Sequence, residues 1–238
     1  MPQHIGIVAC SAEGAALCYR TICTEGGPLL GQHAHPGVSM HTPSLAGTMA
    51  CIYRGDWQGV GEIMLASAGK LAAIGADFLI CPDNTLHQAL PYVLPRSPLP
   101  WLHIAEVVAD AAAARGLRCV GLTGTRWLVE SDVYPDALAS RGLRSIRPGV
   151  AERDVMNRII MDELVCGVFK PESVAWFQRV IGCMKDTGCD AVVLGCTEIP
   201  LIMTDENSPL PTLDSTRLLA RAALHRAVRG SSAMGQRG

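Results

Sequence analysis

The sequence predicts an α/β protein made of two pseudo-symmetric lobes, each with a mostly parallel sheet flanked by helices. Short apolar runs alternate with longer stretches of helical periodicity, which is the pattern of a parallel sheet wrapped by helices. A segment near residue 75 is repeated near residue 188, which indicates that one α/β unit is used twice. The 238 residues, 49% of them hydrophobic, are enough to build a substantial core.

The strands are predicted where apolar runs are bounded by glycine, proline or polar residues, and the helices where apolar residues recur about every 3.6 positions. The strands are expected at Ile5–Ala9, Gly37–His41, Phe78–Cys81, Trp101–Ile104, Cys119–Thr123 and Ala191–Gly195. The helices are expected at Gly14–Glu25, Trp57–Ile74, Ala105–Arg115, Asp132–Ser140, Glu152–Cys166, Pro171–Thr187 and Asp214–Val228. The Pro-rich segment 91–100 is expected to be a linker and the tail 229–238 to be disordered.

The internal repeat fixes which residues should be equivalent in the two lobes. Gly75–Thr85 aligns without gaps on Gly188–Glu198, and both read Gly-x-Asp, an apolar strand, then polar residues that open a helix. The opening strands agree as well, with IGI matching VGL at nearly the same offset. The alignment places Asp83 opposite Cys196, each at the carboxyl end of a strand, where open α/β folds carry out their chemistry.

The first lobe is expected to contain residues 1–97 together with 211–238, and the second lobe residues 98–210. Because the duplicated units would face each other, the active site is expected in the cleft between them. Asp83 and Cys196 would then lie on opposite sides of that cleft.

Composition excludes several classes of function. A net charge of −2 and a pI near 6.4 argue against nucleic acid or an acidic membrane surface as a partner. No apolar stretch approaches the roughly 20 residues of a membrane helix, and the N-terminus does not have the pattern of a secretory signal. The ten cysteines contain no CxxC pair, so reduced thiols and no metal site are expected. These features predict a cytoplasmic protein.

Cys196, in the segment LGCTEIPL, is the candidate reactive thiol. A cysteine between a strand end and a helix start can be ionised by the helix dipole and then serve as a base or nucleophile. The alternative is a buried structural cysteine. The small Gly195 before it and the polar Thr197 after it favour the functional interpretation.

Asp83, Asn84 and Thr85 form the matching polar edge of the first lobe. Their side chains and the helix-opening amides could hold a carboxylate, although the same residues commonly serve as helix N-caps. Thr125, in the segment TGT after a predicted strand, offers a similar cradle of amides and hydroxyls. His87 is expected to pack or hydrogen-bond locally rather than to act as a base.

Several motifs together resemble the aspartate/glutamate racemase family: PDNTLH, GLTGT, VFKPES, LGCTEIPL and DST occur in the family's order along nearly the whole chain. The resemblance implies a cofactor-independent enzyme in which two cysteines, one per lobe, remove and return the proton at the substrate Cα. It implies no metal and no pyridoxal phosphate, and a homodimer. It places Cys196 among the catalytic residues and supports a substrate-binding role for the polar residues Asn84, Thr85, Thr125, Thr197 and Lys170.

The sequence departs from the family at the first catalytic position, where Asp83 stands in place of a cysteine. Cys81 is not a substitute, because it lies in a different strand register and Pro82 intervenes. Three interpretations of Asp83 stay open: a second acid/base, a ligand of the substrate ammonium, or a mark of lost racemisation. A carboxylate here would repel an acidic substrate side chain, so a neutral or cationic amino acid is expected.

The sequence therefore predicts an amino-acid racemase or epimerase acting on a small molecule, with Cys196 as thiolate base and Asp83 opposite. The enzymatic alternative is a one-cysteine carbanion enzyme, such as a decarboxylase of a malonate-like substrate. The alternative from another class is a catalytically silent amino-acid-binding homologue.

Overall fold

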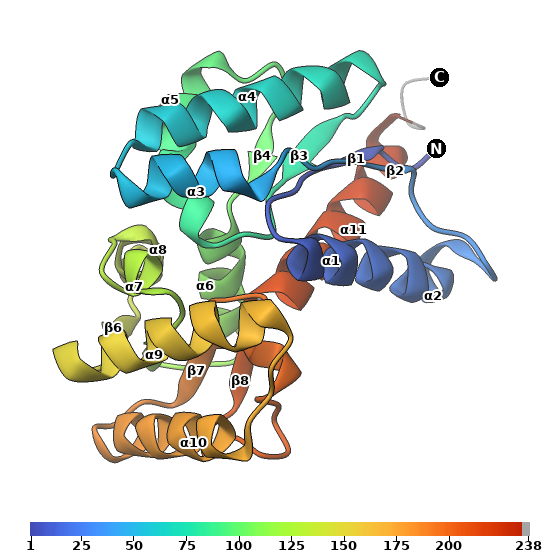
Figure 1. Ribbon diagram of the computed structural model, residues 1–238. Helices are drawn as coiled ribbons and strands as arrows, with labels where there is room; N and C mark the ends of the chain where they lie inside the picture. The colour runs from blue at the N-terminus through green and yellow to red at the C-terminus, as the bar shows by residue number, and fades with distance from the viewer. Residues whose placement is uncertain (235–238) are drawn as a thin grey trace. The chain divides into compact units, whose positions relative to one another are not determined.

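The computed structural model describes residues 1–234, which divide into two compact units (Figure 1). One unit contains Met1–Ile104 and the chain from Thr216 onward, and the other contains Ala105–Ser215. Each unit has a four-stranded, fully parallel sheet flanked by helices. The predicted fold class is confirmed. None of the helices within residues 1–234 is both long and apolar enough to cross a membrane.

The first unit has the strand order β2-β1-β3-β4. Its strands are β1 (Ile5–Val8), β2 (Val38–His41), β3 (Phe78–Ile80) and β4 (Trp101–Leu102). Its helices are α1 (Ala12–Glu25), α2 (Gly27–Leu30), α3 (Leu45–Tyr53), α4 (Trp57–Ala73), α5 (Leu90–Val93) and α11 (Ser215–Met234), with two 3₁₀ turns, η1 (Thr85–Ala89) and η2 (Leu94–Arg96). The long helix α4 packs against β1 and β2 and also contacts η1.

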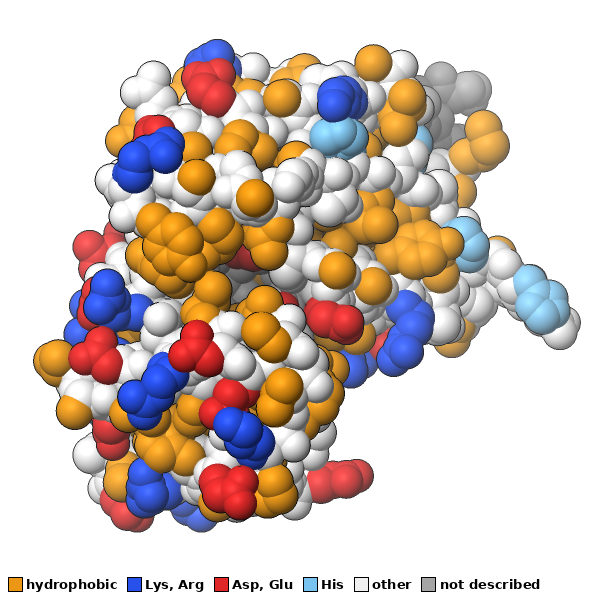
Figure 2. Space-filling view, viewed as in Figure 1, with side chains coloured by type: hydrophobic (Ala, Val, Ile, Leu, Met, Phe, Trp, Pro, Cys, Tyr) orange, Lys and Arg blue, Asp and Glu red, His pale blue; other side chains and the backbone are white. Residues whose placement is uncertain are grey.

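The second unit has the equivalent order β6-β5-β7-β8. Its strands are β5 (Cys119–Thr123), β6 (Arg144–Ile146), β7 (Ala191–Leu194) and β8 (Thr212–Asp214). Its helices are α6 (Ile104–Ala114), α7 (Arg126–Val129), α8 (Val133–Ala139), α9 (Val150–Asp162) and α10 (Pro171–Asp186), with the 3₁₀ turns η3 (Leu164–Cys166) and η4 (Ile199–Leu201). Apolar side chains of α9, α10 and β7 share one core, and charges of both signs are interspersed over the exposed face of α9 and α10 (Figure 2).

Helix α11 belongs to the first unit although it comes last in the chain. Arg221 forms two hydrogen bonds to Glu25, both of 2.8 Å, which join α11 to α1. The Arg226 guanidinium lies 4.5 Å from the centroid of the Phe78 ring, and Gln3 N donates to Ala227 O at 2.9 Å. These contacts hold the C-terminal helix against the first sheet.

The strand registers confirm the internal repeat. In the first unit Ile5 pairs with Phe78, and in the second Val120 pairs with Ala191, which are the residues that the sequence alignment makes equivalent. The two units therefore repeat not only the order of their strands but also the register of the central pair.

One aspartate in each unit bridges the amino ends of the two central strands. Asp77 accepts a hydrogen bond from His4 N at 2.6 Å and donates its own N–H to His4 O at 2.8 Å. Asp190 accepts from Arg118 N at 2.7 Å and from Cys119 N at 3.0 Å, and it donates its N–H to Cys119 O at 2.8 Å. The Gly-x-Asp signature of the repeat is thus explained by this bridge.

The structure corrects the predicted boundaries of the lobes. β4 pairs with β3 in the first sheet, whereas a boundary at residue 98 assigns it to the second lobe. β8 pairs with β7 in the second sheet, whereas a boundary after residue 210 assigns it to the first. Both strands are edge strands of two or three residues, too short for their local sequence to show which sheet they join.

Other predicted elements also differ. The segment 91–100, predicted to be a linker, contains part of α5 and all of η2, because prolines are compatible with the first turn of a helix. Residues 229–234, predicted to be disordered, continue α11, and residues 235–238 lie outside the described part of the chain. The strands β6 and β8 and the helices α2, α3, α5 and α7 were not predicted.

Candidate active site

Cys196 lies just past the carboxyl end of β7 and is 9% exposed. Its thiol donates a hydrogen bond to Glu198 Oε2, with an S···O distance of 2.9 Å. Glu198 is 3% exposed, so both members of this pair are largely removed from water. A buried carboxylate in contact with a thiol forms a dyad that can exchange a proton, here called the thiol–carboxylate dyad.

The backbone before the dyad is held tightly against the neighbouring strand. Gly195 N donates to Thr123 O at 2.9 Å, and a Cβ on Gly195 would lie 2.5 Å from that same oxygen. No side chain larger than hydrogen fits there without moving the backbone. The close approach of β5 and the segment after β7 therefore fixes the position from which Cys196 projects.

The helix that follows Cys196 is too short to ionise its thiol through a helix dipole. That helix, η4, is a single 3₁₀ turn of three residues, and a helix so short has only a small dipole. The structure instead gives the thiol a carboxylate partner. Glu198 was not selected from the sequence, although its place two residues after Cys196 in the segment CTE was the available signal.

Thr125 does not form the open cradle of amides that was expected. Gly124 N donates to Met156 Sδ at 3.3 Å, and Arg126 N donates to Asn157 Oδ1 at 3.0 Å, so both flanking amides already have partners. Thr125 Oγ1 accepts from Leu128 N at 3.4 Å and caps α7. Thr125 is therefore a helix cap in the second unit.

A buried hydroxyl network supports the strand that leads to Cys196. Ser215 Oγ, at the start of α11, donates to Leu194 O at 2.8 Å. Tyr134 is 1% exposed and hydrogen-bonds to Ser215, and burial is the main reason that the pKa of its phenol is raised. The phenol stays protonated, so this network fixes the end of β7 without adding charge to it.

Asp83 follows β3 and caps the turn after it. Its Oδ1 accepts hydrogen bonds from Thr85 N at 3.0 Å and from Leu86 N at 3.3 Å. Donors of this kind favour the ionised carboxylate. Asn84 and Thr85 beside it are 2% and 7% exposed. The first polar edge is thus a compact turn organised around a carboxylate.

Cys81 and His87 close the same turn from inside. The Cys81 thiol donates to Asp83 O at 3.7 Å, and burial, followed by the charge of Asp83, raises the pKa of Cys81, which therefore stays a thiol. His87 donates from Nε2 to Cys81 O at 3.0 Å, the local interaction that was expected. Burial and then the proximity of His103 lower the pKa of His87 to about 3, so its ring is neutral.

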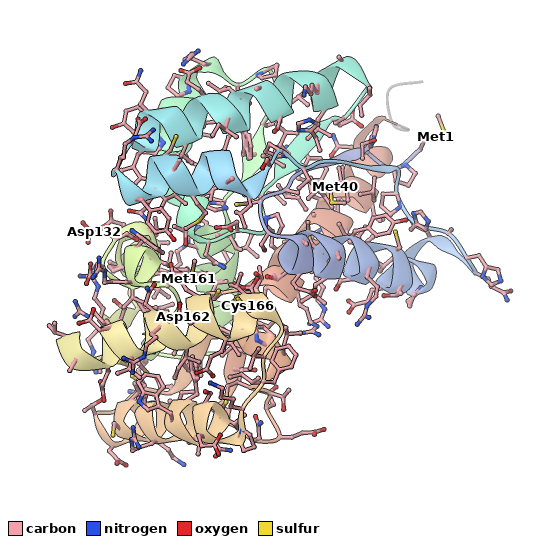
Figure 3. All side chains as sticks on the ribbon, viewed as in Figure 1. Met1, Met40, Asp132, Met161, Asp162 and Cys166 are labelled. Atoms are coloured by element: carbon pink, nitrogen blue, oxygen red, sulfur yellow. The ribbon has the colours of Figure 1, made fainter. Side chains whose placement is uncertain are left out.

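Lys170 is the N-cap residue of α10. It follows the turn η3, whose last residue, Cys166, is labelled in Figure 3. Its Nζ binds Glu163 Oε1 at 3.1 Å, while Ser173 Oγ donates to Glu163 Oε2 at 2.6 Å. The Lys170 side chain is 52% exposed. Its charge is therefore already shared with one carboxylate of its own unit.

Among the predicted site residues, the structure groups Asp83, Asn84 and Thr85 in one turn of the first unit. It groups Cys196 and Thr197 with Glu198 in the second unit, and it holds Lys170 in a separate ion pair. Within residues 1–234, no three His, Cys, Asp or Glu side chains gather closely enough to hold a metal ion.

These features define a class: a duplicated parallel α/β protein with a buried thiol–carboxylate dyad at a strand end. The model of the Asp/Glu/hydantoin racemase family matches residues 7–223. The chain belongs to this family, as the motifs predicted.

Solved structures are similar over most of the chain. A provisionally designated Asp/Glu racemase from Yersinia pestis is 27% identical with a TM-score of 0.86, over 95% of this chain and 99% of that chain. An aspartate racemase homologue from Pyrococcus horikoshii OT3 is 25% identical with a TM-score of 0.81, over 95% of this chain and 99% of that chain. Glutamate racemase from Aquifex pyrophilus shares the fold at 16% identity, with a TM-score of 0.63 over 92% of this chain and 82% of that chain.

Proposed function

We propose that this protein is a cofactor-independent racemase or epimerase that acts on an amino acid or a related small carboxylate. The observation that carries the proposal is the hydrogen bond of 2.9 Å from the Cys196 thiol to Glu198, at a strand end in a chain of the Asp/Glu/hydantoin racemase family. Membership of that family supports an isomerase and a small-molecule substrate.

The dyad defines the resting state of the thiol. A nearby carboxylate that accepts the S–H hydrogen bond stabilises the protonated form of Cys196 and disfavours the thiolate. Cys196 therefore rests as the proton donor. Once it has delivered its proton to the substrate carbon, the thiolate is the base for the reverse direction.

Asp83 is the proposed partner on the opposite face of the substrate. Two backbone N–H groups donate to its Oδ1 and favour the ionised carboxylate, so we propose that Asp83 acts as the base while Cys196 acts as the acid. Inversion at a carbon acid needs this complementary pair, and the two half-reactions exchange the protonation states of the two groups.

The charges favour a neutral or cationic amino acid over an acidic one. Asp83 and Glu198 each contribute a carboxylate to the proposed machinery, and Lys170 is already paired with Glu163. Two fixed anions repel an acidic substrate side chain and attract an ammonium group. We propose that Asn84, Thr85 and Thr197 bind the substrate carboxylate through their amide and hydroxyl groups. The capping role of Thr125 and the ion pair of Lys170 with Glu163 argue against the same role for these two predicted residues.

The second candidate is a one-cysteine carbanion enzyme, such as a malonate-type decarboxylase. It is favoured by the capping role of Asp83, since an oxygen that already accepts two N–H bonds is a weaker base. In that reaction Cys196 alone would protonate a carbanion formed by loss of carbon dioxide.

Deuterium exchange separates these functions. The protein is incubated in D₂O with a panel of acidic, neutral and basic amino acids, and deuterium at Cα is followed by NMR together with the chirality of the product. Exchange with inversion, absent in Cys196→Ser, supports the racemase. Exchange with retention supports one-sided chemistry. Binding without exchange across the panel overturns the proposal in favour of a silent homologue. Carbon dioxide release from arylmalonates or alkylmalonates would identify the second candidate.

Asp83→Cys tests the charge argument separately. The variant restores the thiol that the family has at this position and removes a carboxylate, so turnover of aspartate should rise relative to turnover of neutral amino acids. If the unmodified protein turns over aspartate as well as Asp83→Cys does, repulsion by Asp83 does not select the substrate.

A further inference from the structure

Two cysteines outside the proposed site lie close together at the amino end of the second sheet. The sulfur atoms of Cys119 and Cys189 are 3.9 Å apart, although the residues are 70 positions apart in the sequence. Cys119 is 1% exposed and Cys189 is 5% exposed. Both are free cysteines.

The backbone around the pair is held in place by the Asp190 bridge described above. Three hydrogen bonds of 2.7 to 3.0 Å join Asp190 to Arg118 and Cys119. From the strand spacing and rise, the Cα atoms of Cys119 and Cys189 are about 6 Å apart, within the range that a disulfide spans. Closing the sulfur–sulfur distance therefore needs side-chain rotation and small shifts rather than a rearrangement of the sheet.

The repeat shows that the fold itself does not require these cysteines. The first unit has the same aspartate bridge, with Asp77 in place of Asp190. At the positions equivalent to Cys119 and Cys189 it carries His4 and Ala76. The bridge is thus common to both units, and the pair of thiols is an addition particular to the second.

We propose that Cys119 and Cys189 are an oxidisable dithiol that closes to a disulfide when the protein meets a peroxide. In the first step one thiol is oxidised to a sulfenic acid and hydrogen peroxide is reduced to water. In the second step the other thiol displaces hydroxide from the sulfenic sulfur, forming the S–S bond and releasing a second water. Two thiols are oxidised for each peroxide reduced.

The disulfide would act on stability rather than on the reactive thiol. It would tie β5 to the turn before β7, whereas Cys196 lies past the opposite end of β7. The cross-link closes a long loop and so restricts the unfolded chain. Burial, followed by the proximity of Cys119, raises the pKa of Cys189 to about 12, so the pair stays reduced at low peroxide and oxidises slowly at neutral pH.

The test uses the full chain with Cys196→Ser, which removes the other reactive thiol from the same tryptic peptide. The protein is treated with millimolar hydrogen peroxide, and the cysteines that remain unoxidised are then blocked by alkylation. Tryptic peptides are analysed by mass spectrometry without reduction. The expected product joins peptide 119–126 to peptide 186–217, since cleavage follows Arg118, Arg126, Lys185 and Arg217. The midpoint temperature of thermal unfolding should rise by roughly 5–10 °C on oxidation and should return to its original value on reduction.

Cys189→Ala is the matched variant, because the first unit already carries Ala76 at the equivalent position. It should lose both the linked peptide and the thermal shift. Cys166→Ser combined with Cys183→Ser removes two exposed thiols and should keep both. The proposal is overturned if Cys189 is converted to sulfinic or sulfonic acid without a cross-link. It is also overturned if peroxide leaves both thiols alkylatable, or if the thermal shift survives in Cys189→Ala.

Discussion

Replacing Glu198 by glutamine tests the thiol–carboxylate dyad directly. The side chain keeps its size but loses the charge that accepts the Cys196 hydrogen bond at 2.9 Å. We expect the thiolate form of Cys196 to become more populated, because the group that stabilises the protonated thiol is removed.

The magnitude follows from the kind of hydrogen bond that is lost. A hydrogen bond to a charged group contributes about 1.5–3 kcal/mol, and a neutral amide that takes its place about 0.5–1.5 kcal/mol. The net change is about 1–2 kcal/mol, and one factor of ten corresponds to about 1.4 kcal/mol. The ratio of thiolate to thiol should therefore rise roughly 5- to 30-fold. Because both groups are buried, bulk solvent screens the effect little.

The assay is the rate of iodoacetamide alkylation of Cys196 at pH 7, with the modified residue located by peptide mass spectrometry. Alkylation should accelerate in Glu198→Gln by that same factor. Glu206→Gln is the matched control, since Glu206 is an exposed glutamate of the same unit and its removal changes net charge equally. Equal alkylation rates in Glu198→Gln and the unmodified protein, or an equal gain in Glu206→Gln, would refute the dyad.

Three further substitutions test Cys196 itself, the close approach at Gly195 and the buried ring of His87. Cys196→Ser should lower the rate of Cα exchange at least about 1000-fold, because a serine hydroxyl is a far weaker acid than a thiol at neutral pH. Deuterium NMR measures this rate, and a rate above one-tenth of that of the unmodified protein would assign the chemistry to another residue. Gly195→Ala should lower the free energy of unfolding, measured in urea, by about 1–3 kcal/mol, because the added Cβ would lie 2.5 Å from Thr123 O. An unchanged urea concentration at the midpoint of unfolding would show that the strand end can move. His87 has a pKa of about 3 when folded and an ordinary value near 6.5 when unfolded, so the unfolded chain binds one more proton between these values. The contribution of the neutral His87 ring to the free energy of unfolding is complete above pH 6.5 and is lost as the pH falls. His87→Gln should therefore reduce the slope of the free energy of unfolding against pH by about 1.4 kcal/mol per pH unit between pH 4 and 6.

The sequence predicted the repeat, and the repeat predicted much of the candidate site. The equivalence of Asp83 and Cys196 came from aligning the chain on itself, and the pairing of Ile5 with Phe78 and of Val120 with Ala191 reproduces that alignment. The alignment identified equivalent residues correctly because a duplicated α/β unit keeps its strand register, so residues at the same offset in the sequence hold the same positions in the two sheets. The local role of His87 was also predictable, since a turn of five residues brings its ring back to the strand end.

The sequence by itself determined the fold class, the repeat and the position of the thiol, because each depends on local patterns or on their recurrence. Only the tertiary structure decided which sheet the edge strands β4 and β8 join, because strands of two or three residues are too short for their sequence to indicate the strand they pair with. It also decided that the amides beside Thr125 are occupied, because their partners Met156 and Asn157 come from another helix. The pairing of Cys119 with Cys189 is of the same kind: they are 70 positions apart in the sequence, and they come close because β5 pairs with β7 in the sheet.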